Sequence, residues 1–150
     1  MRLIKTSKDR YQFHLPAREK ELLLHVLSLY PQIPSGHHRL SKSDGGEESN
    51  QRLLDDALSE SRSHNKKQLE SLLSDPRALK HGDDGWHLTL RSQDVEWLLQ
   101  VLNDIRVGSW ICLGSPEMPL KELKAEEAPS FWAMETAGYF QMRFLELIED

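Results

Sequence analysis

The sequence has a single cysteine and no long apolar run. Because Cys112 has no second cysteine to pair with, an intramolecular disulfide is excluded, and a structural zinc site would need mainly histidines. No apolar stretch approaches the roughly 20 residues that cross a bilayer, which excludes a transmembrane helix. Charged residues occupy positions 1–10, where a secretory signal needs an apolar stretch. We therefore expect a cytoplasmic protein without a membrane partner.

The sequence also lacks the common catalytic and nucleotide-binding motifs. It contains no G-x-x-x-x-G-K-[ST] loop, no G-x-G-x-x-G turn and no G-x-S-x-G elbow. Cys112 follows an apolar helix, so we expect a buried, unreactive thiol. These absences favour a non-enzymatic protein without catalytic residues or a cofactor.

Charge is moderate and slightly acidic. Charged residues make up 29% and apolar residues 38% of the chain, a balance typical of a globular protein. The formal net charge of −5 argues against binding nucleic acid through overall electrostatics, although a local basic patch remains compatible with it.

The first half of the chain predicts a hairpin and two helices. Tyr11, Phe13 and Leu15 alternate with polar residues, which predicts a hairpin over 2–15 with one buried face. A helix follows Pro16 and ends before Pro31. We expect a surface connection over 31–49 and a second helical region over 50–74. The latter has no apolar residue over 59–68, which predicts that it breaks or leaves the core there.

The second half repeats this order of elements. We expect a turn over 81–85, a strand over 86–90, and a helix capped by Ser92 that extends to Ile111. A surface connection over 114–130 leads to a final helix over 131–148. Its predicted buried stripe contains Ala133, Ala137, Phe140, Phe144 and Ile148. The pattern predicts one α+β domain over 1–150, with four to five helices covering a small antiparallel sheet.

Two segments of the chain align without gaps. Six of seventeen columns are identical between 11–27 and 86–102. The identical pairs are Leu15 and Leu90, Glu21 and Glu96, Leu23 and Leu98, Leu24 and Leu99, Val26 and Val101, and Leu27 and Leu102. Either a duplication or two similar strand–helix patterns explains the match. In both cases the two strands can pair in one sheet with helices over one face.

One histidine and aspartate cluster is a candidate metal site. It has the pattern H-x-D-D-x-x-H and contains His81, Asp83, Asp84 and His87. Two imidazoles and two carboxylates on a turn could bind a metal or serve a hydrolase. Because Asp-Asp-Gly is also ordinary turn chemistry, we favour a plain turn without metal and keep the metal site as an alternative.

Two polar groups need an explanation. Arg62, Lys66 and Lys67 form the best basic cluster, and a DNA-binding regulator using them is a further alternative to a solvated helix face. Asn103, Asp104 and Arg106 interrupt the most apolar helix. Because buried polar groups must be hydrogen-bonded, we interpret these three as a structural network that ties the helix to a neighbouring backbone.

The chain resembles a bacterial family of uncharacterised proteins, mainly actinobacterial, classed as a domain of unknown function. The resemblance rests on three stretches: 10–29, the segment 86–114 with WLLQVLNDIR at Trp97–Arg106, and GYFQMRFL at Gly138–Leu145. The chain departs from the family pattern in the loop after the first helix and at 107–110. Members are often encoded beside the adaptor of the Clp protease. The resemblance therefore implies a small cytoplasmic bacterial protein with a link to regulated proteolysis or gene regulation.

The aromatic content of the helices exceeds what one face of each helix can bury. An apolar surface of this kind usually marks a protein interface. We predict a regulatory or protein-interaction protein that forms a homodimer, contacts another protein, or does both. The residues predicted to form the interface on the last helix are Trp132, Tyr139, Phe140 and Phe144.

Overall fold

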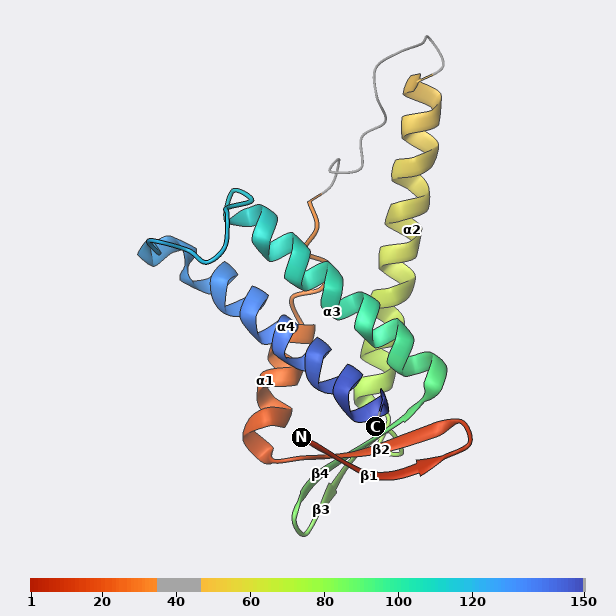
Figure 1. The fold of residues 1–150 in the computed structure, drawn as a ribbon. Coiled ribbons are helices and arrows are strands. Elements are labelled where there is room, and N and C mark those ends of the chain that lie inside the picture. Colours follow the sequence, from red (N-terminus) through yellow and green to blue (C-terminus); the bar gives the residue numbers. More distant parts are fainter. Residues whose placement is uncertain (35–46, 150) are drawn as a thin grey trace.

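The structure, a computed structural model, describes residues 1–34 and 47–149 and contains a four-stranded antiparallel sheet (Figure 1). Its strands lie in the order β1-β2-β4-β3. They are β1 (Arg2–Ser7), β2 (Arg10–Leu15), β3 (Leu79–Gly82) and β4 (Gly85–Arg91). The predicted hairpin and third strand are confirmed, and β3 is an additional strand.

Five helical segments accompany the sheet in the described part of the chain. They are α1 (Ala17–Leu27), α2 (Glu47–Ser74), α3 (Ser92–Cys112), the short 3-10 helix η1 (Ala125–Glu127) and α4 (Ala128–Glu149). Figure 1 shows α1, α3 and α4 over one face of the sheet, with α3 and α4 side by side. The predicted α+β class is confirmed. None of the helices among the described residues is long and apolar enough to cross a membrane.

The N-terminal half of helix α2 projects away from the other helices (Figure 1), whereas Asn65 in its C-terminal half is hydrogen-bonded to Trp97 of α3. Helix α2 begins at Glu47 and continues without a break through 59–68, because this stretch holds no proline or glycine to interrupt a helix. Of the two outcomes expected for 59–68, the break is therefore wrong, whereas the departure from the core agrees with the structure, in which none of these residues is buried.

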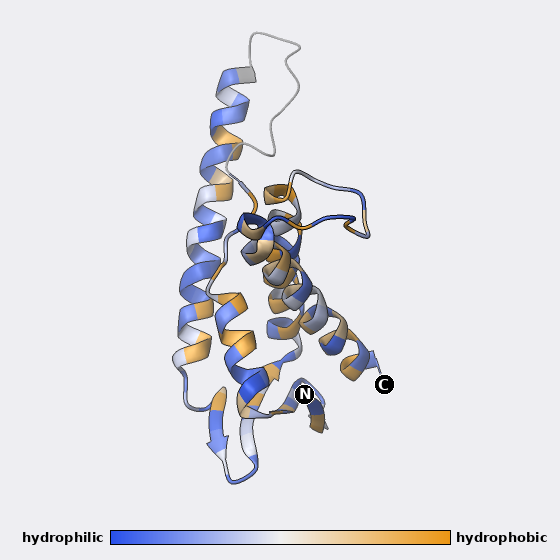
Figure 2. Cartoon of the chain, turned by 90° about the vertical axis from the view of Figure 1, so that its left-hand side faces the viewer, coloured by the Kyte–Doolittle hydropathy of each residue, from blue (hydrophilic) through white to orange (hydrophobic). Residues whose placement is uncertain are grey.

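Figure 2 shows that most residues of α2 are hydrophilic. Leu69 near its C-terminal end is buried, whereas Leu53 is 68% exposed. Most of the predicted connection, 35–46, lies outside the described residues.

Arg91, and not the predicted Ser92, is the N-cap residue of α3. The carboxylate of Asp94 accepts hydrogen bonds from the backbone N–H of Arg91 at 3.3 Å and from its Nε and Nη2 at 2.8 and 2.9 Å. The Asp94 carboxylate therefore caps the N-terminus of α3, as the acidic residue at the third helical position does in a capping box.

The two similar segments form equivalent structures that pair with each other. Strands β2 and β4 are antiparallel neighbours, and Phe13 lies opposite Leu88 at the centre of their pairing. Helices α1 and α3 begin at Ala17 and Ser92, which occupy the same column of the alignment. The core lies between this central strand pair and the helices, where the Phe13 ring meets the edge of Phe144 at 5.1 Å.

Candidate functional site

The histidine and aspartate cluster is divided between two faces of the β3–β4 hairpin. His81 pairs with Trp86, and His87 pairs with Lys80, so the two imidazoles point to opposite faces. The ring of His81 lies 5.0 Å from that of Trp86. His87 Nε2 lies 3.1 Å from Asp84 Oδ1, and this hydrogen bond lowers the pKa of the aspartate. Within the described ranges, no three histidine, cysteine or acidic side chains are grouped to hold a metal ion.

The turn of this hairpin is attached to the neighbouring strand β2. The Nε2 atom of the buried His14 lies 2.7 Å from the carbonyl oxygen of Asp84. Gly85 has a φ of 132°, and a Cβ there would lie 2.9 Å from the carbonyl oxygen of Leu15. The turn therefore packs against β2, and this close approach accounts for a glycine at position 85 without a metal site.

The predicted interface residues do not share one surface. Phe140 and Phe144 are completely buried inside the chain, so they cannot contact a partner. Trp132 is half-buried, and its ring lies 4.8 Å from that of His25 on α1. Tyr139 is 40% exposed, and partial burial followed by the nearby Glu19 raises the pKa of its hydroxyl. Only Tyr139 of the four therefore lies on an open surface.

Of the seven large apolar side chains that are exposed among the described residues, four lie along a groove between α3 and α4, which we call the α3–α4 groove, and its recess: Met118, Tyr139, Met142 and Leu145. The volume of the groove is about 670 Å³. The lining residues are Arg106, Val107, Trp110, Met118, Met134, Glu135, Gly138, Tyr139 and Met142. A recess of about 370 Å³ continues the groove past Leu145 to Glu149 near the C-terminal end of α4. Tyr139, Met142 and Leu145 form a second apolar stripe of α4 outside the core stripe, and the predicted interface contained only Tyr139 of these three.

The connection after α3 forms one wall of the groove. Gly114 and Ser115 have φ values of 86° and 54°, in the left-handed region, and turn the chain back toward the helix. The Nε1 atom of Trp110 donates a hydrogen bond to the carbonyl oxygen of Pro116 at 2.9 Å. This bond holds the connection beside the groove, where Met118 is 49% exposed.

The polar residues within α3 hold neighbouring segments. Asp104 Oδ1 accepts hydrogen bonds from the backbone N–H groups of Gln32 at 2.7 Å and Ile33 at 3.4 Å. Asn103 Oδ1 accepts from Arg106 Nη2 at 3.0 Å. The contacts of Asp104 tie α3 to the segment after α1, which is the kind of backbone contact that the sequence predicts for this group.

The predicted basic cluster on α2 is split. Arg62 donates a hydrogen bond to the carbonyl oxygen of Ile33 at 2.7 Å, and Lys66 is exposed. Lys67 lines a cleft of about 740 Å³, which we call the α2–β4 cleft. Its lining residues are Arg10, His64, Lys67, Gln68, Ser71, Leu72, Asp75, Arg77, Ala78, Thr89, Arg91, Asp94 and Trp97. Five of them come from β2, β4 and α3, so spacing along one helix could not reveal this cleft: Arg10, Thr89, Arg91, Asp94 and Trp97.

Cys112 is exposed, contrary to the prediction of a buried thiol, because it lies on the outer side of the last turn of α3.

Comparison of the chain with models of protein families, with curated proteins and with solved structures finds no match.

Proposed function

We propose that this protein is a non-enzymatic interaction protein that binds an amphipathic helix of a partner in the α3–α4 groove. The observation that carries the proposal is an apolar groove lined by three methionines, on a protein in which 29% of the residues are charged. Methionine side chains are flexible and polarisable, and binding surfaces that accept a partner's apolar face use them often. A groove between two packed helices also matches the width of a third helix.

The charges of the groove favour a basic partner. Among the described residues that line the groove and its recess, Arg106 is the one cation, whereas Glu135, Glu146 and Glu149 are acidic. A helix with apolar residues on one face and lysine or arginine on both flanks would pair with Glu135 and Glu149, whereas Glu146 already forms an ion pair with Arg143 at 2.8 Å. The groove and recess follow α4 over 134–149, which corresponds to about four turns of a bound helix.

A second copy of the chain is a poorer occupant. In a two-fold symmetric dimer the same surface meets itself, so the acidic rim would face an acidic rim. We therefore favour a basic partner over the homodimer expected from the sequence as the occupant of the groove. The process that such a partner serves, regulated proteolysis, is an expectation carried by the resemblance alone.

A designed peptide tests the proposal directly. The probe is a fluorescein-labelled 14-residue helix with leucines at i, i+3, i+4 and i+7 and lysines on both flanks, compared with the same helix carrying glutamates. We expect the lysine peptide to bind at least about fivefold more tightly, as judged by fluorescence anisotropy. Equal binding of the two peptides, or no binding of either, would contradict the proposal.

Two matched variants locate the binding. Met142→Lys places a charge in the groove and should weaken binding of the lysine peptide at least about tenfold. Leu53→Lys makes a similar change at an exposed leucine on α2 and should leave binding unchanged. Sedimentation at tens of micromolar tests self-association. A dimer that dissociates in Met142→Lys would identify the second copy as the occupant and overturn our choice of partner.

A further inference from the structure

The α2–β4 cleft concentrates positive charge on an acidic protein. Four cations, Arg10, Lys67, Arg77 and Arg91, line it together with only two carboxylates, Asp75 and Asp94. The lining therefore carries an excess of two positive charges, whereas the whole chain has a formal net charge of −5. Such a local reversal of charge favours an anionic ligand.

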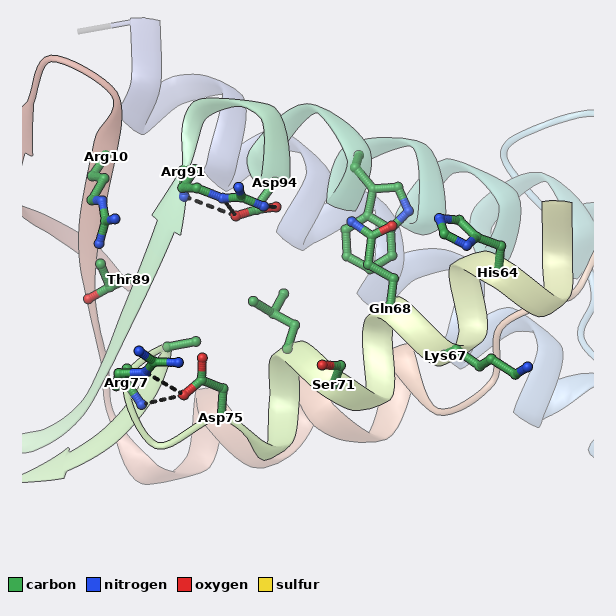
Figure 3. Close-up of a pocket in the computed structure, with 13 residues that line it drawn as sticks. Arg10, His64, Lys67, Gln68, Ser71, Asp75, Arg77, Thr89, Arg91 and Asp94 are labelled. Atoms are coloured by element: carbon green, nitrogen blue, oxygen red, sulfur yellow. Dashed lines mark hydrogen bonds and ion pairs between the residues drawn. The ribbon is translucent and has the colours of Figure 1, made fainter.

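The arginines gather at one end of the cleft. Arg10 and Arg91 lie directly opposite each other on β2 and β4. Asp94 compensates these like charges in part, because it pairs with Arg91 and its pKa is lowered by Arg91 and also by the charge of Arg10. Figure 3 shows Arg10 and Thr89 side by side at this end, with the Arg91–Asp94 and Arg77–Asp75 pairs on either side. The carboxylate of Asp94 is held by Arg91. Within residues 1–34 and 47–149, Arg10 forms no ion pair of its own.

The rest of the cleft supplies an apolar surface and a fixed aromatic ring. Leu72, Ala78 and Trp97 belong to the lining. The Nε1 atom of Trp97 donates to Asn65 Oδ1 at 3.1 Å, and the amide nitrogen of Asn65 donates to the hydroxyl of Tyr30 at 3.0 Å. These two hydrogen bonds fix the indole, so a ligand ring can pack against the lining without ordering a mobile side chain.

We propose that the α2–β4 cleft binds a small phosphate monoester, with its phosphate between Arg10, Arg91 and the hydroxyl of Thr89 and its body against Trp97 and Leu72. Arginine guanidinium groups and a hydroxyl are the donors that proteins use for phosphate oxygens. The volume of about 740 Å³ fits a ligand the size of a mononucleotide. This site lies apart from the α3–α4 groove and has a separate role.

Calorimetric titrations of the full chain with AMP, ribose 5-phosphate, inorganic phosphate and adenosine test the proposal. We expect AMP to bind in the micromolar to millimolar range and adenosine to bind at least about tenfold more weakly, because adenosine lacks the phosphate. The Trp97 indole resonance in a ¹H–¹⁵N spectrum should shift with AMP. Equal affinities of AMP and adenosine, or no binding of the three phosphates at 10 mM, would overturn the proposal.

Variants distinguish the cleft from general surface charge. Arg10→Gln should weaken AMP binding about tenfold, and Thr89→Val about fivefold, because each removes one hydrogen bond to phosphate. Lys8→Gln makes the same change of charge in the β1–β2 turn, outside the cleft, and should alter the affinity less than about twofold. An equal loss in Lys8→Gln and Arg10→Gln would contradict the site.

The phosphate could also belong to a nucleic-acid backbone, and an oligonucleotide separates the two sources. The probe is a single-stranded eight-residue oligothymidylate, titrated under the same salt conditions as AMP. We expect it to bind no more tightly than AMP. Binding at least about tenfold tighter, with a steep decrease as salt is raised, would assign the cleft to nucleic acid and overturn the small-molecule proposal.

Discussion

The two strand–helix units of the molecule, 11–27 and 86–102, have the same backbone plan but different continuations. Their strands pair at the centre of the sheet, and their helices begin at equivalent residues. The equivalent positions also agree in burial: Leu23 and Leu98 are both buried, whereas Glu21 and Glu96 are both exposed. The shared pattern therefore specifies a common core-building unit.

The difference begins where the similarity ends. Helix α1 stops at Leu27, whereas α3 continues to Cys112. The extra turns carry Asp104, which holds the segment after α1, and Trp110, which lines the α3–α4 groove. The common part of the units thus builds the core, and the part unique to the second unit builds the candidate binding surface.

Truncation of equivalent core leucines should have the largest and most symmetric effect. We expect Leu23→Ala and Leu98→Ala each to lower the free energy of unfolding by about 2–5 kcal/mol, because each leaves a cavity in the core. The two losses should agree within about 1 kcal/mol. Chemical denaturation measures both, with the exposed Leu53→Ala as the control. A loss in only one unit would contradict their structural equivalence.

Substitution of Gly108 tests the C-terminal part of α3, which has no counterpart in α1. A Cβ at this position would lie 2.3 Å from the backbone carbon of Gln32 and 2.4 Å from the nitrogen of Ile33, so the close approach of α3 to this segment requires glycine. We expect Gly108→Ala to destabilise the protein by about 3 kcal/mol in thermal or chemical unfolding. Gly138→Ala is the matched control, because its Cβ would meet only Arg106 Cδ at 3.5 Å. The control should be neutral or slightly stabilising.

Substitution of Asp104 tests the same contact between α3 and the segment after α1, with a smaller expected loss of stability. Asp104→Ala removes the acceptor of the Gln32 and Ile33 N–H groups and should cost about 1–3 kcal/mol in chemical denaturation. Asp104→Asn keeps one acceptor oxygen and should recover part of the loss. Asn103→Ala, on the neighbouring position, should cost less than about 1 kcal/mol. Equal costs at the two positions would show that the contact to the segment after α1 contributes little.

Sequence patterns predicted the elements whose signal is local. The alternation of Tyr11, Phe13 and Leu15 predicts β2, and the spacing of leucines predicts α1 and most of α3. Strand β3 escaped the prediction because Leu79–Gly82 has one large apolar side chain and depends on its pairing with β4. The polar stretch of α2 predicted either a break or a departure from the core, and the structure shows the second, because helix formers without a packed face can extend from the core as one helix.

The candidate sites depended on information that the sequence carries only indirectly. Phe140 and Phe144 were assigned both to the core stripe and to the interface, and a side chain on the core stripe cannot also be on the surface. The α3–α4 groove joins Arg106, Met118 and Met142, which tertiary packing brings together. Likewise, Arg10 and Arg91 meet through the β2–β4 register, which spacing along the chain does not reveal.

The smallest expected effect on stability concerns the N-termini of α1 and α3, because only α3 has a side chain that caps it. Pro16 precedes α1 without a side-chain cap, whereas Asp94 caps α3 and its hydrogen bonds with Arg91 lower the pKa of the carboxyl below its ordinary value of 3.8. Because the folded pKa is lowered, the carboxylate stabilises the fold above the unfolded pKa, and this contribution is lost as the pH falls through the folded value.

We therefore expect Asp94→Asn to lower the free energy of unfolding by about 1 kcal/mol near neutral pH. The difference from the unmodified chain should shrink as the pH is lowered below about 4, because protonation of Asp94 removes the same interaction from the unmodified chain. Urea denaturation at a series of pH values measures this difference, with the exposed Glu96→Gln in the same turn of α3 as the control. A difference that stays constant over this pH range would show that the Asp94 carboxylate does not stabilise α3 through its charge, and the two helix starts would then be equivalent despite their different residues.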